Sequence, residues 1–156
     1  MKPTQVLMED HRVIEHVLSA MQLAAERLSR DELIRPAFFI NAALFITNFA
    51  DGIHHRKEEG VLFPAMIDSG IPARGGPVAV MLAEHEQARL FTREMKDAAE
   101  KMEKGIRSAR AAVIQNALGY VALLRPHIHK EDNILFPMAD RVIKPELQLK
   151  VEEDFS

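Results

Sequence analysis

The sequence contains no cysteine among its 156 residues. This absence excludes disulfide bonds, thiolate metal ligands and a thiol nucleophile. It also excludes iron–sulfur clusters bound through cysteine and a structural zinc site of the cysteine type. Any metal ion must therefore be held by histidine and carboxylate side chains.

Long apolar runs and excess charge of one sign are also missing. No apolar run approaches 18 residues, and the N-terminus lacks the charged-then-apolar pattern of a signal peptide. The net charge of −3 gives no electrostatic reason to expect nucleic-acid binding. We therefore expect a cytoplasmic protein with neither a membrane nor a nucleic acid as partner. Its length and its 47% hydrophobic content favour one globular domain over residues 1–156.

No segment shows the alternating pattern of a strand, and glycine and proline are concentrated between residues 68 and 77. Apolar residues recur every three or four positions, which predicts helices over residues 4–29, 36–64, 77–104 and 108–138. Pro64 should kink or end the second helix, and Pro126 should bend the fourth. A short amphipathic helix is expected from residue 144. The loop lengths predict an all-α, up-down-up-down four-helix bundle with a short C-terminal helix.

Two segments of the chain repeat each other. The segment from His54 to Pro64 matches the segment from His127 to Pro137, with His, Lys, Glu, Leu, Phe and Pro at the same offsets. Such a repeat indicates two structural units of similar form. In each copy a histidine precedes a glutamate by four residues, which places both side chains on one face of a helix. An imidazole and a carboxylate aimed at one point suit a metal such as iron.

Two more histidines, His11 and His85, fall within the apolar stripes of the first and third helices. Each lies seven or eight residues after its helix begins, whereas His54 and His127 lie ten residues before a proline near the end of theirs. At about 1.5 Å per residue, all four should lie ~10–15 Å from the same end of an antiparallel bundle. Four inward-facing imidazoles are therefore expected at one level.

Two glutamates at that level would be costly to bury without a compensating cation. The stripes offer no lysine or arginine there, so a metal ion is the simplest compensation. Six donors exceed the needs of one tetrahedral zinc and suit two six-coordinate ions that share both carboxylates. The predicted ligands are His11, His54, Glu58, His85, His127 and Glu131.

Several nearby polar residues are expected to lie outside this set. His16 and His129 are rotated off the stripes, while His55 adjoins a ligand and is left open as a residue that can line the interface. Tyr120 shares the stripe of the fourth helix two turns before His127; we expect a core aromatic, with a redox or ligand role as the alternative. Acidic residues that can accept from imidazole N–H groups are Glu59, Glu84 and Asp132.

The sequence resembles the hemerythrin-like family, also called the HHE cation-binding domain. The resemblance rests on the residues around His11, His54–Glu59, His85 and His127–Asp132, and it extends from about Leu7 to about Asp140. It implies one hemerythrin-like domain with a non-haem di-iron site inside a four-helix bundle. Two oxo- or hydroxo-bridged iron ions are the cofactor that it implies, with manganese or zinc as possible substitutes.

The resemblance also bears on function. Oxygen-carrying hemerythrins have a further histidine one turn after that of the third helix, and here this position is Arg89. Similar proteins with four histidines and two glutamates are linked to nitrosative stress and iron-centre repair, usually with a cysteine-bearing segment. We expect a module that binds O2, NO or a related small ligand at an open iron position, for sensing, storage or delivery. The alternative is a peroxidase or catalase-like enzyme, or iron-centre repair.

Overall fold

The computed structural model describes all 156 residues, and every regular element in it is a helix. The prediction of an all-α protein is confirmed. Several α-helices continue into π-helical stretches, labelled η, in which backbone hydrogen bonds run from residue i to i+5. The elements in chain order are α1 (Pro3–Ser29), α2 (Pro36–Phe45), η1 (Ile46–His55), η2 (Glu58–Leu62), α3 (Phe63–Asp68), α4 (Pro77–Glu103), η3 (Arg107–Ala109, a 3₁₀ turn), α5 (Arg110–Lys130), η4 (Glu131–Leu135), α6 (Phe136–Val142) and α7 (Pro145–Phe155).

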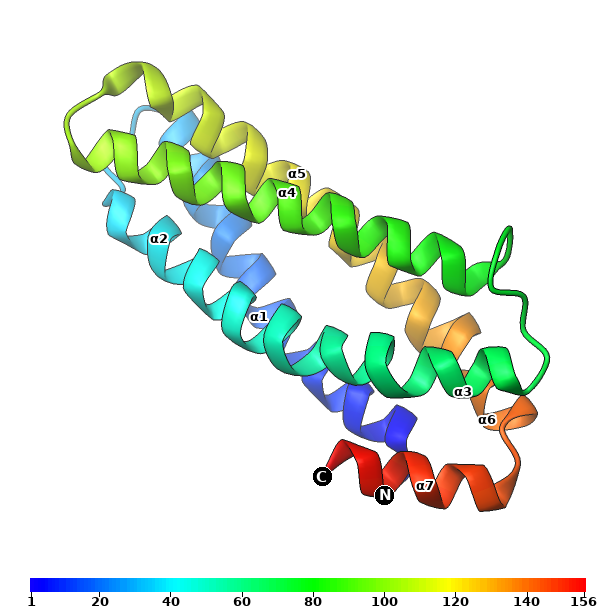
Figure 1. Ribbon diagram of the computed structural model, residues 1–156. Coiled ribbons are helices and arrows are strands. Elements are labelled where there is room, and N and C mark those ends of the chain that lie inside the picture. The colour runs from blue at the N-terminus through cyan, green and yellow to red at the C-terminus, as the bar shows by residue number, and fades with distance from the viewer.

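Figure 1 shows how these elements are arranged. The segment from α2 to α3 forms one long helix, and so does the segment from α5 to α6. These two lie alongside α1 and α4, and consecutive long helices run in opposite directions (Figure 1). The C-terminal helix α7 lies across one end, close to the N-terminus (Figure 1). The tail helix expected from residue 144 is therefore present, and it begins at Pro145.

Proline starts the helices and glycine ends some of them. A proline occupies the first position of α1, α2, α4 and α7, where its missing N–H has no helical partner to lose. Gly70 follows α3 with φ of 109°, and Gly105 follows α4 with φ of 90°. These left-handed conformations suit glycine and allow the chain to turn away from the helix end. Local sequence therefore determines where most of the helices begin and end.

Pro64 does not end its helix, which was one of the two predicted outcomes. The helix continues to Asp68, with Pro64 directly after the π-helical turn η2. Pro137 follows η4 in the same way. A proline ring clashes with the carbonyl group four residues earlier, and for both prolines that carbonyl lies within the π-helical turn. The wider turn makes room for the ring, so the Leu-Phe-Pro repeat is accompanied by a π turn in each copy.

These turns shift the buried face of each helix by one residue. A repeat of three or four residues continued from Glu58 and Glu131 predicts Val61 and Ile134 on the inner face. The buried residues are instead Leu62 and Leu135, and Ile134 is 54% exposed. A π turn contains more residues than the 3.6 of an α-helical turn. A prediction that keeps the α-helical period through such a turn therefore names the residue one position before the buried one.

The buried apolar residues form two separate clusters. The larger one includes Ile14, Ala50, Ala88 and Leu124. The smaller one lies toward the end that carries α7 and includes, along the same four long helices, Leu7, Leu62, Met81 and Leu135. On each helix the predicted metal ligands fall between the residues of the two clusters. A buried polar layer therefore separates the two cores.

One helix, Pro36–Asp68, is long and apolar enough to cross a membrane by length and composition alone. The core helix of a soluble protein passes the same test. Here His54, His55 and Glu58 lie on this helix and are buried by the rest of the chain. The feature is therefore weak support for a membrane span.

Candidate metal centre

The polar layer contains all six predicted ligands, and each is at most 1% exposed. Four of them, on three helices, come together in one group, and the two glutamates meet His85 and His127 in another. Within each group the candidate ligand atoms all lie within 4.8 Å of one another. The groups are His11, His54, Glu58 and Glu131, and Glu58, His85, His127 and Glu131. Because both contain Glu58 and Glu131, these carboxylates stand between two possible ion positions.

His55 joins the second position, where it forms a further group with His85 and His127. It is 2% exposed, and its ring stacks on that of His85 with the centroids 3.7 Å apart. Sequence reasoning left this residue open because neighbouring residues on an α-helix point about 100° apart. The structure brings both His54 and His55 inward at the end of the π-helical stretch η1. The candidate donors thus include five imidazoles instead of four.

The Nε2 atoms of the histidines converge on the carboxylates. His11 Nε2 lies 3.0 Å from Glu131 Oε1, and His127 Nε2 lies 3.3 Å from the same oxygen. His54 Nε2 lies 2.6 Å from Glu58 Oε1. The Nε2 atoms of His85 and His127 are 3.2 Å apart. The donors therefore face a common interior.

Several of these atoms lack a hydrogen-bond partner although they are fully buried. They are His54 Nε2, both carboxylate oxygens of Glu58 and Glu131 Oε2. The short distance between His54 and Glu58 does not have hydrogen-bond geometry, so proximity alone does not satisfy them. Leaving a buried charged acceptor unpaired costs several kcal/mol. Positive ions between these donors would satisfy them, so the residues present fit a metal pair.

The Nδ1 atom of each of the five histidines meets a carboxylate on the outside of the centre. Such an N–H···carboxylate contact fixes the ring orientation and directs Nε2 toward a metal. The sequence predicted Glu59, Glu84 and Asp132 in this role, whereas it did not identify Asp10 and Asp51. The pairs are His11 with Asp132 at 2.7 Å, His54 with Asp10 at 3.1 Å, His55 with Asp51 at 3.0 Å, His85 with Glu59 at 2.7 Å and His127 with Glu84 at 2.9 Å.

Basic residues hold four of the five outer carboxylates. Arg89, at the position where oxygen carriers place a histidine, donates to Glu59 at 2.5 Å and so supports the partner of His85. Asp51 has no such ion pair. The other pairs are Arg12 with Asp132, Lys57 with Asp10 at 3.5 Å and Lys130 with Glu84 at 2.7 Å.

The charges in the metal-free centre are distributed unevenly. Burial, with the neighbouring carboxylate of Glu131, raises the pKa of Glu58 well above its usual range. Burial opposes the charge of Glu131, but its close contacts with Glu58, His11 and His127 keep its pKa low. Burial also works against a charged His11, yet its contacts to Asp132 and Glu131 raise its pKa to about 9. Burial lowers the pKa of His55 well below the usual range, so that ring is neutral.

The remaining candidates lie outside the centre or beside it. His16 and His129 are exposed, and neither falls in a group that can hold a metal. Tyr120 is 1% exposed and belongs to the larger apolar cluster, as expected of a core aromatic. Its hydroxyl group has no hydrogen-bond partner. Burial, followed by the charge of Asp51, raises its pKa well above 10, which keeps the phenol protonated.

The fold and the centre define an all-helical domain whose buried histidines and glutamates can hold metal ions. The chain belongs to the Hemerythrin HHE cation binding domain family, which it matches over residues 2–139. The resemblance predicted from the motifs is confirmed.

The individual proteins that this chain resembles share a quarter to a third of the aligned residues with it, and they are longer than it is. An uncharacterized protein of Mycobacterium tuberculosis is 24% identical over 131 residues, which cover 84% of this chain and 51% of that protein. The iron-sulfur cluster repair protein YtfE of Pectobacterium atrosepticum is 31% identical over 134 residues, covering 84% of this chain and 60% of the relative. The chain thus spans about half to three fifths of the length of these relatives. No solved structure matches it.

Proposed function

We propose that this chain, as an up-down-up-down four-helix bundle, holds two bridged iron ions and binds O2 or a related small diatomic molecule. Glu58 and Glu131 would bridge the ions, with His11 and His54 on one ion and the other three histidines on its neighbour. Manganese or zinc can occupy the same donors. The iron pair would supply the electrons for reversible binding of the diatomic ligand.

The unequal number of imidazoles is the observation that carries this proposal. With two bridging carboxylates, the ion at His55, His85 and His127 has one more nitrogen donor than the ion at His11 and His54. The ion at His11 and His54 would therefore keep an additional position for a small molecule. Arg89 stands where oxygen carriers have their fifth histidine, and its presence weighs against a carrier-like arrangement. His55 supplies a fifth imidazole from a different helix.

The surrounding residues would protect that position. The ring of His11 stacks on Phe136, with centroids 5.5 Å apart and planes 12° apart. The two apolar clusters close the centre on both sides along the helices. Such walls exclude water and admit a small uncharged molecule more readily than an anion. Outside the walls, the carboxylates at each Nδ1 hold the rings in place.

Stopped-flow mixing of the ferrous protein with O2, and separately with hydrogen peroxide, tests the function. A stable oxygen adduct that disappears when O2 is removed supports the binding role. Sustained peroxide turnover instead supports a peroxidase or catalase-like enzyme. Metal analysis of an iron-grown preparation should give about two ions per chain; one ion or fewer contradicts the dinuclear arrangement.

Repair of iron–sulfur clusters is the second candidate, and the similarity to YtfE proteins favours it. The match covers 60% of that relative, so activity that depends on the rest of its chain need not follow. The absence of cysteine in this sequence weighs against a thiol-assisted step. An assay that restores a damaged iron–sulfur enzyme with the iron-loaded protein distinguishes this role from reversible O2 binding.

A further inference from the structure

The helix that carries His54 and His55 is π-helical over the ten residues Ile46–His55. Such stretches are rare and usually span a single turn. Apart from His55, the buried residues here recur at a constant step of four, at Ile46, Ala50, His54 and Glu58. A purely α-helical segment would alternate steps of three and four to stay on one face. The wider turns therefore keep His54 on the inner face and bring His55 onto it as well.

The second copy of the repeat lacks this feature. The segment before His127 is α-helical from Arg110 to Lys130. The residue equivalent to His55 is Ile128, which is 3% exposed and belongs to the larger apolar cluster. The extended π stretch and the fifth imidazole thus occur together in one copy, and both are absent from the other.

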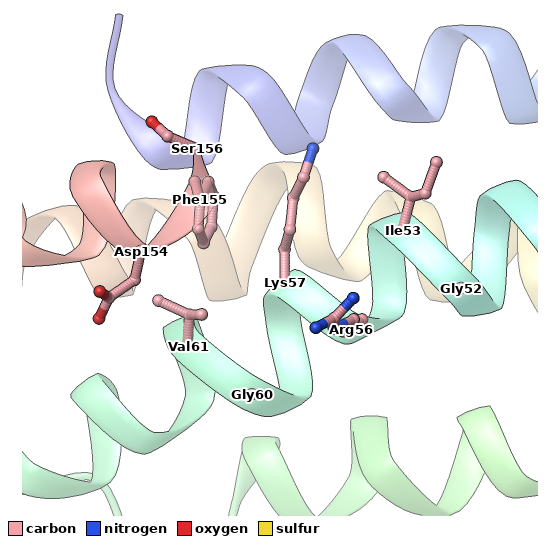
Figure 2. A pocket seen from close by; sticks show the side chains of 9 residues that line it. All are labelled: Gly52, Ile53, Arg56, Lys57, Gly60, Val61, Asp154, Phe155 and Ser156. Carbon is pink, nitrogen blue, oxygen red and sulfur yellow. The ribbon is translucent and has the colours of Figure 1, made fainter.

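Gly52 lies inside the π stretch and fits it closely. A β-carbon at this position would lie 3.1 Å from the backbone oxygen of Thr47, five residues earlier. That oxygen is the i−5 partner of a π turn, and the contact is tight enough that the Thr47 carbonyl group must give by a few tenths of an ångström. Gly60, two turns later on the same helix, has nothing within 4 Å of a β-carbon. Figure 2 shows both glycines along a groove of about 480 Å³ beside Arg56, and both are exposed.

We infer that Gly52 is a positioning residue: it permits the π-helical stretch that turns His55 inward, and so sets the number of imidazoles at the metal pair at five. The inference rests on the proposed metal centre. A side chain at residue 52 favours the narrower α-helical turn, which carries His55 off the inner face while His54 keeps its place. The centre then resembles the four-histidine arrangement that the sequence alone predicts.

The test compares Gly52→Ala with Gly60→Ala. Both substitutions replace an exposed helical glycine by alanine, and both raise intrinsic helix propensity by the same amount. Only the first introduces the contact with Thr47. Metal affinity is measured by competition with a chelator, using Co²⁺ as the probe, together with the visible spectrum of the bound cobalt. We expect Gly52→Ala to weaken binding about 10–100-fold and to shift the spectrum, and Gly60→Ala to change neither.

A double-mutant cycle shows whether the effect passes through His55. Adding Gly52→Ala to a His55→Ala protein should produce no further loss of affinity, because the ligand that it displaces is already gone. Equal affinities and spectra for Gly52→Ala and Gly60→Ala would overturn the inference, and so would full additivity in the cycle. If the wild-type protein binds no metal, the proposed function fails, and this outcome is distinct from both.

A measurement on the wild-type protein covers the case in which Gly52→Ala does not fold. Metal loading should slow hydrogen exchange of the amides in residues 46–56, because a ligated His55 holds the π stretch. The corresponding amides before His127 serve as the control. Protection of residues 46–56 should be lost in the metal-loaded His55→Ala protein. Undiminished protection there would contradict the coupling between the π stretch and His55.

Discussion

His55 and Ile128 occupy equivalent places in the two copies of the repeat: each follows a histidine of the centre by one residue, and both are buried. The ring of His55 lies among the candidate metal ligands, whereas the side chain of Ile128 packs in the apolar core. The apolar partner shows that this position accepts a branched hydrocarbon of similar size. The pair therefore suggests a substitution that removes the imidazole with little disturbance of packing.

His55→Ile should give a folded protein with one nitrogen donor fewer. We expect its iron content to fall below that of the wild type, or its iron charge-transfer absorption to shift and weaken. His16→Ala and His129→Ala should leave both signals unchanged, because these histidines are exposed and outside the centre. Metal analysis and absorption spectra provide the measurement. Unchanged iron and spectrum in His55→Ile would remove His55 from the ligands.

Glu59 and Glu86 both contact Arg89, each at 2.5 Å, but only Glu59 also contacts the Nδ1 atom of His85. Glu59→Gln should weaken metal binding about 10–100-fold, because the amide no longer attracts the N–H of the ring as strongly. Glu86→Gln is the matched control and should bind metal like the wild type. Equal losses in both variants would show that the arginine, and not the contact to His85, supports the centre.

Removal of the metal should leave two buried carboxylates in contact and lower the melting temperature. Glu58→Gln removes the carboxyl group whose pKa burial and Glu131 raise. The metal-free variant should therefore be more stable than the metal-free wild type, by about 1–3 kcal/mol. It should also lose most of the stabilisation that metal gives. Denaturant unfolding with and without metal measures both effects, and a less stable metal-free Glu58→Gln protein would contradict the placement of this carboxylate.

The sequence predicts much of this arrangement because its main signals are periodic. The stripes through His11 and His85 lie in uninterrupted α-helices, where a period of 3.6 holds from end to end. The ligands in the repeat could be recognised because His54 and Glu58 reappear as His127 and Glu131. The spacing alone therefore predicts which way these side chains point and how far along the bundle they lie.

The errors arise where the helix departs from α geometry. Val61 and Ile134 were placed one residue early because each follows the start of a π turn. The spacing leaves His55 open, because adjacent residues on an α-helix point about 100° apart. One signal was available: Ile128, an apolar residue at the matching offset of the other copy, indicates an inward position. The contacts of Asp10 with His54 and of Asp51 with His55 depend on how the imidazole rings are oriented. The period of the apolar residues does not predict ring orientation.

Tyr120 presents a buried hydroxyl group without a partner. An unsatisfied hydroxyl group costs stability, so Tyr120→Phe should be neutral or stabilising by about 1 kcal/mol. It should leave iron content and absorption unchanged if the ring serves only the core. Thermal unfolding and the iron spectrum are the measurements. A shifted spectrum with unchanged stability would instead assign the hydroxyl a role at the centre, as the alternative interpretation of this residue holds.

Proton release should make metal binding depend on pH. The pKa of His11 is raised to about 9 in the metal-free protein, and that of Glu58 is raised as well. A raised folded-state pKa stabilises the folded protein below the unfolded value, and this contribution is lost as pH rises. Metal-free stability should therefore decline between pH 6.5 and 9. Over the same range metal affinity should increase, by about tenfold per pH unit for each proton displaced.

The stabilisation by metal should consequently grow with pH over this window, since the loaded protein no longer carries those protons. Melting temperatures of metal-free and loaded protein at pH 6.5, 7.5 and 8.5 measure the difference directly. His11→Gln provides the control, because it removes the titrating ring and should flatten the decline of the metal-free protein. A difference that stays constant or shrinks as pH rises would show that His11 is neutral before the metal binds. The contacts of His11 to Glu131 and Asp132 would then not hold a proton in the metal-free centre.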